Sequence, residues 1–246
     1  MLSISADDAR AVAITTAIHS GDLDFLQQQL RDTQELALAR VRDRRGVSRT
    51  LLHIAADWPG HFPNAAAAVR LLAAAGADVN AYVMHPDPHC AAETALHWAA
   101  SSDDVAVLDA LLDSGADIEA AGAVFTGGTA MSDAVVFAQW NAARRLLERG
   151  ATTTLWQAAA LGLLDRVREV CLIAPAPTPE NITNAFWHAC RGGQQVTAHD
   201  LLDRGAEINW VGYDSKTPAD AAHESGSAEL VVWLRERGAK RASALR

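Results

Sequence analysis

The chain has 246 residues, of which half are hydrophobic and 21% are charged, a composition typical of a folded protein rather than a disordered one. Its formal net charge of -9 disfavours duplex nucleic acid as a partner, because phosphate binding depends on clustered lysines and arginines. No uninterrupted apolar stretch of about 18 residues is present, so the sequence predicts no membrane span.

The first predicted element is a helix pair near the N-terminus. Ile14 and Ala17 lie at helical spacing before a turn at Gly21, and residues 22–30 are expected to form the second helix. The next elements repeat in a fixed register. The intervals from Thr94 to Gly115, from Thr129 to Gly150 and from Thr217 to Gly238 each span 21 positions, as does the interval from Asn184 to Gly205.

This register predicts repeated pairs of helices. A threonine or asparagine side chain caps the first helix of a pair, and a glycine ends the second helix in the left-handed conformation. Small residues such as Ala99 and Ala100 allow close helix contact, while pairs such as Leu111 and Leu112 supply apolar burial. One such unit cannot bury its apolar face alone, so the units must stack.

The segments TLLHIAA at 50–56, TALHWAA at 94–100 and KTPADAA at 216–222 resemble the ankyrin repeat, as do GADVNA at 76–81, GADIEA at 115–120 and GAEIN at 205–209. The resemblance implies an all-α, ankyrin-type helix-turn-helix solenoid of about six to seven repeats with short β-hairpin or loop fingers. It also implies that the first helices and the fingers line a concave face.

Two insertions interrupt the register. Residues 57–64 lengthen the turn inside the second unit, and residues 82–90 form an extended finger before the third unit. Insertions in repeat proteins lie in loops, often on the binding face. We therefore expect these two loops to roof a common groove.

A deletion follows, since Thr129 and a second capping threonine, Thr153, are only 24 positions apart. This spacing leaves no room for a finger and predicts an interrupted groove. A proline-rich connection at 174–179 precedes the next helix. The sequence thus predicts two sub-stacks: an N-terminal one at 1–152 with long loops and a C-terminal one at 153–246 that ends in a cap.

The resemblance, together with the aromatic and histidine content, selects candidate partner-binding residues. Exposed aromatic clusters commonly mark interaction sites. The candidates are Asp57, Trp58, His61, Phe62, Tyr82, His85, His89, Trp98, Asp133, Phe137, Trp140, His188 and Arg191.

Each candidate also has a purely structural interpretation that involves no partner. A tryptophan among alanines equally well fills a packing gap, and Trp156 and Trp187, at the motif-histidine position, are expected to be packed. His53 and His97 are expected to tie units together through backbone hydrogen bonds, as the resemblance implies. A metal site is disfavoured because His85, His89 and Cys90 fall short of four ligands at recognisable spacing.

Sequence signatures of common enzymes are absent, and no cofactor is expected. A catalytic triad of Asp57, Asp133 and His188 would require the fold to bring them together. The leading hypothesis is a binding module for a protein partner, without nucleic acid or membrane. The alternative is a small-molecule-binding protein or enzyme with a pocket lined by aromatics and histidines; a closed cavity would favour it.

Three cysteines without a C-x-x-C pair, and a first segment without a basic region before an apolar run, favour a reducing cytoplasm. Lysine is rare beside arginine and alanine, which favours a GC-rich bacterial gene.

Overall fold

The computed structural model describes residues 2–87, 89–90 and 92–245, and fourteen α-helices follow one another in the described residues. Pro88, within the expected finger, lies outside this range. The chain forms two compact units, 1–151 and 152–246, which are described separately. The predicted domain boundary stays a prediction, because compactness does not show that either unit folds alone.

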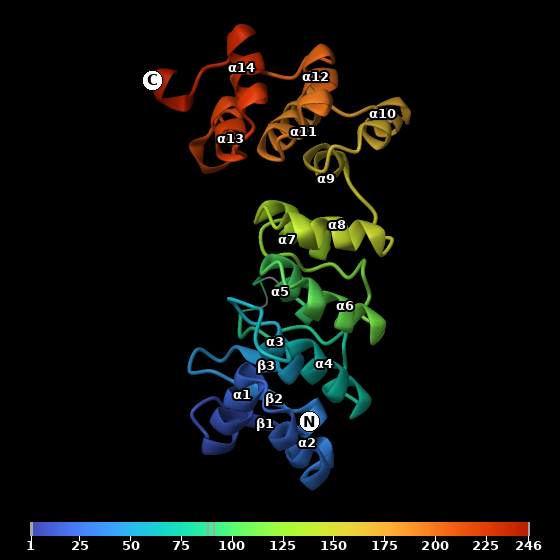
Figure 1. Ribbon diagram of the computed structural model, residues 1–246, viewed down its shortest axis with the longest axis vertical. Coiled ribbons are helices and arrows are strands. Elements are labelled where there is room, and N and C mark those ends of the chain that lie inside the picture. Colours follow the sequence, from blue (N-terminus) through green and yellow to red (C-terminus); the bar gives the residue numbers. More distant parts are fainter. Residues whose placement is uncertain (1, 88, 91, 246) are drawn as a thin grey trace. The chain divides into compact units, whose positions relative to one another are not determined.

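In the first unit, helices with odd numbers stack in one layer and helices with even numbers stack in the next (Figure 1). We call the odd-numbered helices the first-helix layer. The helices are α1 (Ala9–Ser20), α2 (Leu23–Asp32), α3 (Leu51–Ala55), α4 (Ala65–Ala74), α5 (Ala95–Ser101), α6 (Val105–Asp113), α7 (Ala130–Val136) and α8 (Trp140–Glu148).

The predicted cap positions of the first helices in this unit are confirmed, although the Thr129 side chain makes no cap hydrogen bond. Thr50, Thr94 and Thr129 are the N-caps of α3, α5 and α7, all in extended backbone conformation. Gly115 and Gly150 adopt φ values of 95° and 94° after the second helices, in the left-handed region that glycine enters without steric cost. Repetition of the same cap chemistry explains why the helix pairs recur in register.

A three-stranded sheet near the N-terminus shows that the all-α expectation was wrong for this segment. Strand β1 (Ser3–Ser5) pairs in parallel with β2 (Arg40–Arg42), which pairs antiparallel with β3 (Ser48–Thr50). The buried Arg40 guanidinium donates to the carbonyl oxygens of Ser48 and Tyr82 at 3.0 and 2.7 Å. The sheet therefore anchors the base of the 82–90 finger.

Two buried histidines join successive helix pairs, as expected. His53 Nδ1 lies 2.8 Å from Thr50 Oγ1, and its Nε2–H donates to the carbonyl of Glu93 at 3.1 Å. His97 repeats the arrangement with Thr94, at 2.9 Å, and with the carbonyl of Gly128, at 3.3 Å. Each acceptor carbonyl immediately precedes the N-cap threonine of the following pair. The ring thus fixes one helix pair to the start of the next.

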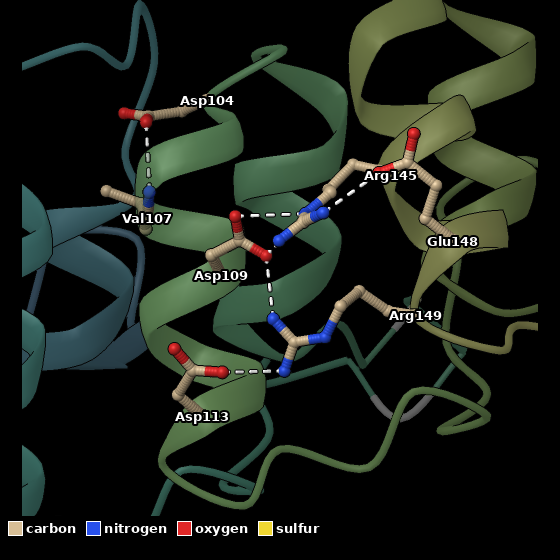
Figure 2. Close-up of polar contacts among 7 residues, drawn as sticks. All are labelled: Asp104, Val107, Asp109, Asp113, Arg145, Glu148 and Arg149. Carbon is tan, nitrogen blue, oxygen red and sulfur yellow. Dashed lines mark hydrogen bonds and ion pairs between the residues drawn. The ribbon is translucent and has the colours of Figure 1, made fainter.

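The second-helix layer is joined by ion pairs between α6 and α8 (Figure 2). The Asp109 carboxylate accepts from Arg145 at 2.8 Å and from Arg149 at 2.7 Å. Arg149 also reaches Asp113 at 2.7 Å, and Arg145 reaches Glu148 at 2.8 Å. Asp109 is the centre of this network because it alone binds both arginines.

Replacing Asp109 by asparagine is expected to lower the free energy of unfolding by about 1–2 kcal/mol, because two charge-assisted hydrogen bonds at a partly buried carboxylate are lost. Glu148→Gln is the matched control, since the exposed Arg145–Glu148 pair is worth below about 0.5 kcal/mol. Urea denaturation of both variants checks this. Equal effects of the two substitutions would show that the network does not couple α6 to α8.

The second unit contains three further helix pairs in two layers (Figure 1). Phe186 and Trp187 are its largest fully buried side chains. Its elements are α9 (Leu155–Ala160), α10 (Leu164–Leu172), α11 (Pro179–Arg191), α12 (Gln195–Asp203), the 3-10 turn η2 (Tyr213–Ser215), α13 (Pro218–Glu224) and α14 (Ala228–Glu236).

Two predicted caps in this unit were wrong. Asn184 lies in the middle of α11, which begins after Thr178 with a capping box between Thr178 and Asn181. Proline at the first helical position allows the helix to begin upstream of Asn184. The N–H group that proline lacks would have no intrahelical acceptor at this position. Helix α9 is capped by Thr154 rather than Thr153, so Gln157, and not Trp156, occupies the motif-histidine position.

Trp187 replaces the joining histidine in α11. Its indole Nε1–H donates to the carbonyl of Lys216 at 3.0 Å, and Lys216 precedes the N-cap Thr217 of α13. The contact is the same as those of His53 and His97, made by a larger donor. The packing interpretation of Trp187 therefore holds, with a specific hydrogen bond added.

Candidate functional site

The candidate site of the first unit follows its first-helix layer. We call the end where α3, α5 and α7 begin the finger end, because Tyr82 of the finger pairs with Thr94 there. We call the opposite end the turn end, because the 57–64 insertion follows α3 there. Seven residues of α5 separate the two ends by about 10 Å.

Trp98 lies between charged groups on the face of α5. Its indole N–H donates to Glu93 at 3.3 Å, and the Arg49 guanidinium lies 5.9 Å from the ring centroid. Arg49 in turn pairs with Asp57 at 2.9 Å. Burial raises the pKa of the Glu93 carboxyl, and the Trp98 hydrogen bond opposes this rise. These contacts hold the half-buried indole in one orientation.

Asp133 lies beneath the loop that precedes α7. Its side chain is 1% exposed, and it accepts a hydrogen bond from the backbone of Val124. Burial, aided by the neighbouring charge of Glu93, raises the pKa of Asp133 to about 8, and its Oδ2 atom has no partner among the described residues. The expectation that Asp133 is presented to a partner was therefore wrong, because the loop covers it.

The same loop presents exposed aromatic surface. Phe125 is 72% exposed and packs on Phe137, which is itself exposed, with ring centroids 5.8 Å apart. Between this loop and the finger runs a groove of about 490 Å³, open to solvent, which we call the finger groove. It is lined by Tyr82, His89, Ala92, Ala121, Gly122, Ala123, Val124, Phe125 and Gly127.

The 57–64 insertion lies at the turn end, away from this groove. The backbone N–H of His61 donates to Asp104 Oδ2 at 2.6 Å, and Phe62 stacks on His19 with ring centroids 4.0 Å apart. Trp58 is 81% exposed. The expectation that the two long loops roof one groove was wrong, because they leave the first helices at opposite ends.

The remaining predicted binding residues of this unit lie outside the aromatic contacts described above. Trp140 is half-buried at the first residue of α8, after the turn end of α7. His85 is half-buried and His89 is exposed in the finger. Within the described ranges, no three His, Cys, Asp or Glu side chains gather where they could hold a metal ion.

The second unit brings His188 and Arg191 into an aromatic cluster. His188 is 4% exposed, and its ring lies 4.7 Å from Trp156 and 5.4 Å from Tyr213. Burial lowers the pKa of His188 to about 4. The expectation that His188 is exposed was therefore wrong. Arg191 is half-buried and reaches the surface. Asp57 and Asp133 belong to the first unit and His188 to the second, so the catalytic triad stays a prediction.

Four residues of this surface were not predicted from the sequence: Phe125, Val124, Arg49 and Glu93. Phe125 had a detectable signal, since it is an aromatic residue between Gly122 and Gly127 in a segment that already had to be a loop. Arg49 and Glu93 each precede a capping threonine. Their contacts with Trp98 depend on side-chain directions that spacing does not give.

Comparison with known protein families identifies the ankyrin repeat at residues 48–82 and again at residues 93–123. These ranges contain the pairs α3–α4 and α5–α6, which carry His53 and His97. No curated protein matches the chain. In the part of the chain covered by the structure, every helix is too short or too polar to cross a membrane.

Proposed function

This chain is an ankyrin repeat protein, and we propose that it binds a protein partner through the first-helix layer of its first unit, from the finger groove to Phe137 at the end of α7. The contact surface is an aromatic patch, defined as Tyr82, Trp98, Phe125 and Phe137, together with the finger groove. Ankyrin repeats generally serve as protein-interaction modules. The single observation that carries the proposal is the pair of exposed, mutually packed rings of Phe125 and Phe137.

Physical arguments support this surface. Large exposed aromatic groups beside one another are unfavourable in water unless a partner covers them, and aromatic residues dominate binding energy at protein interfaces. The finger groove is open, as expected for a docking surface, whereas a small-molecule site buries most of its ligand. Trp98 is already oriented by Glu93 and Arg49, so binding costs little side-chain entropy.

We extend the family assignment to the helix pairs outside the matched ranges, giving the expected six to seven repeats. The supporting observation is that Trp187 and the cap Thr217 repeat the joining contact seen at His53 and His97. A reducing cytoplasm remains the proposed compartment, since all three cysteines are free.

The double substitution Phe125→Ala and Phe137→Ala tests the proposal. We expect it to reduce capture of specific partner proteins at least tenfold, because aromatic anchors commonly contribute about 2 kcal/mol or more each. Immobilised wild-type and variant proteins would be compared by quantitative mass spectrometry of bound lysate proteins.

Trp58→Ala is the matched control, since Trp58 is an exposed aromatic group in the 57–64 insertion, outside the aromatic patch. Undiminished capture by the double variant, or an equal loss with Trp58→Ala, would overturn the assignment of the aromatic patch.

A further inference from the structure

One face of α11 in the second unit carries a row of polar side chains, of which Arg191 has no hydrogen-bond or ion-pair partner among the described residues. Asn184, His188 and Arg191 are spaced by four and three residues, so they lie on the same side of the helix. Trp156 of α9 and Tyr213 of η2 stand beside His188, at 4.7 and 5.4 Å between ring centroids. Aromatic rings thus flank a row of polar side chains.

Arg191 is the charged member of this row. In the part of the chain that the structure describes, its guanidinium makes no hydrogen bond or ion pair, and it lies 5.7 Å from the centroid of Trp187. The nearby carboxylates of Asp214 and Glu224 are instead paired with Lys216, at 3.7 and 2.8 Å. Burial lowers the pKa of Arg191, which shows that part of its hydration has been lost. A partly desolvated cation without a partner gains most from an incoming anion.

The other two members offer hydrogen-bond acceptors. His188 Nδ1 lies 2.9 Å from the carbonyl of Asn184, which can only accept, so Nδ1 carries the proton and Nε2 is left as an acceptor. Burial lowers the pKa of His188 to about 4, so the ring stays neutral near pH 7. Asn184 Oδ1 is buried without a partner. Arg191 is therefore the member of this row that an incoming group can reach, because His188 and the Oδ1 atom of Asn184 are buried.

We propose that this face of α11 binds an acidic segment of a protein partner. A glutamate or aspartate carboxylate of that segment pairs with Arg191. The aromatic rings of Trp156 and Tyr213 contact apolar side chains of the segment. This inference rests on the proposed protein-binding function and names the chemistry of the partner.

A carboxylate fits the surroundings of Arg191 better than a phosphate group does. Asp214 and Glu224 are close enough to raise the pKa of Arg191 while remaining bound to Lys216. A dianion placed on Arg191 would be repelled by both carboxylates more strongly than a monoanion. The planar guanidinium also matches the two oxygens of a carboxylate.

The test uses synthetic, end-blocked heptapeptides whose central residue is glutamate, glutamine or phosphoserine and whose other positions are varied uncharged residues. Binding to the full-length protein is measured by an array, and the best sets are then titrated by fluorescence anisotropy. We expect the glutamate peptide to bind at least tenfold more tightly than its glutamine counterpart, because a charge-assisted bidentate pair is gained. The phosphoserine peptide should bind no more tightly than the glutamate peptide.

Two arginine variants make the assignment specific. Arg191→Gln should abolish the preference for glutamate over glutamine. Arg237→Gln is the matched control, since Arg237 also lies over a tryptophan, 4.4 Å from the centroid of Trp233, but is exposed and bonded to its own helix. The unfolding midpoint of Arg191→Gln should stay close to that of the wild type, because Arg191 makes no hydrogen bond within the described residues.

Several outcomes would overturn the inference. These are equal binding of glutamate and glutamine peptides, no peptide binding, a glutamate preference that survives Arg191→Gln, and a clear preference for phosphoserine. The Phe125→Ala, Phe137→Ala variant should keep its glutamate preference in this assay. Failure of the aromatic patch and failure of the α11 face can therefore be told apart.

Discussion

Replacing Trp187 by alanine is expected to lower the free energy of unfolding of the second unit by about 3–5 kcal/mol. The side chain is 1% exposed, so its removal leaves a cavity in the core of that unit. It also leaves the carbonyl of Lys216 without its donor, and α13 without its link to α11. Urea denaturation followed by circular dichroism measures the loss.

Two further variants separate volume from hydrogen bonding. Trp187→Phe keeps most of the volume but removes the N–H donor, so we expect a loss of about 1–2 kcal/mol. Trp58→Ala, at an 81% exposed position, should change stability by less than about 0.5 kcal/mol. A loss below about 1 kcal/mol for Trp187→Ala would show that the indole does not join the two helix pairs.

Acidification from pH 7 to pH 5 is expected to destabilise the first unit through His53, by about 2 kcal/mol. Burial lowers the pKa of this histidine from 6.5 to about 4, with smaller contributions from Arg40, Arg49 and His97. The unfolded chain therefore binds a proton between pH 6.5 and about 4 that the folded chain does not. Stability is full above pH 6.5 and is lost as the pH falls toward about 4.

The His53→Gln variant isolates this effect. Glutamine is a suitable replacement because Gln157 fills the same position in α9, where it accepts the N–H of Thr154 at 2.7 Å. Asp133 has the opposite pH dependence, since its raised pKa of about 8 makes stability fall as the pH rises from 3.8 to about 8. The comparison is therefore the change between pH 7 and pH 5 in the variant and in the wild type. An identical change in both would contradict the lowered pKa of His53.

Helix ends could be predicted from the sequence wherever a particular residue type satisfies a particular requirement of the backbone. Thr50 and Thr217 cap helices because their hydroxyls accept hydrogen bonds from free N–H groups, and Gly115 enters the left-handed region where other residues are strained. The roles of the motif histidines were expected from the ankyrin resemblance. These residue preferences act over a few positions and apply in any stack of helix pairs.

The prediction failed where one position admitted two local structures. Asn184 matched the spacing of a cap, but Pro179 and Thr178 form a stronger helix start upstream, so the asparagine lies within the helix. The short sheet was not predicted because each of its strands has only three residues, too few for a periodic pattern.

The candidate site was predictable only in part. Spacing placed Trp98 and Phe137 on the first-helix layer, yet it could not show that Val124 and its loop cover Asp133. Nor could it show that the two insertions leave the helices at opposite ends, because loop length does not determine loop direction. Arg191 stays a predicted partner contact, and its lack of an ion-pair partner depends on Lys216 binding both neighbouring carboxylates.

The central claim is that the first unit docks a protein through the aromatic patch and the finger groove, and site-specific photocrosslinking tests it most directly. A photoreactive phenylalanine analogue would replace Phe125 in one variant and Trp58 in another, both highly exposed positions at opposite ends of the first helices. The account predicts discrete crosslinked adducts from position 125, and few or none from position 58. Adducts from position 58 alone, or equally from both positions, would contradict it.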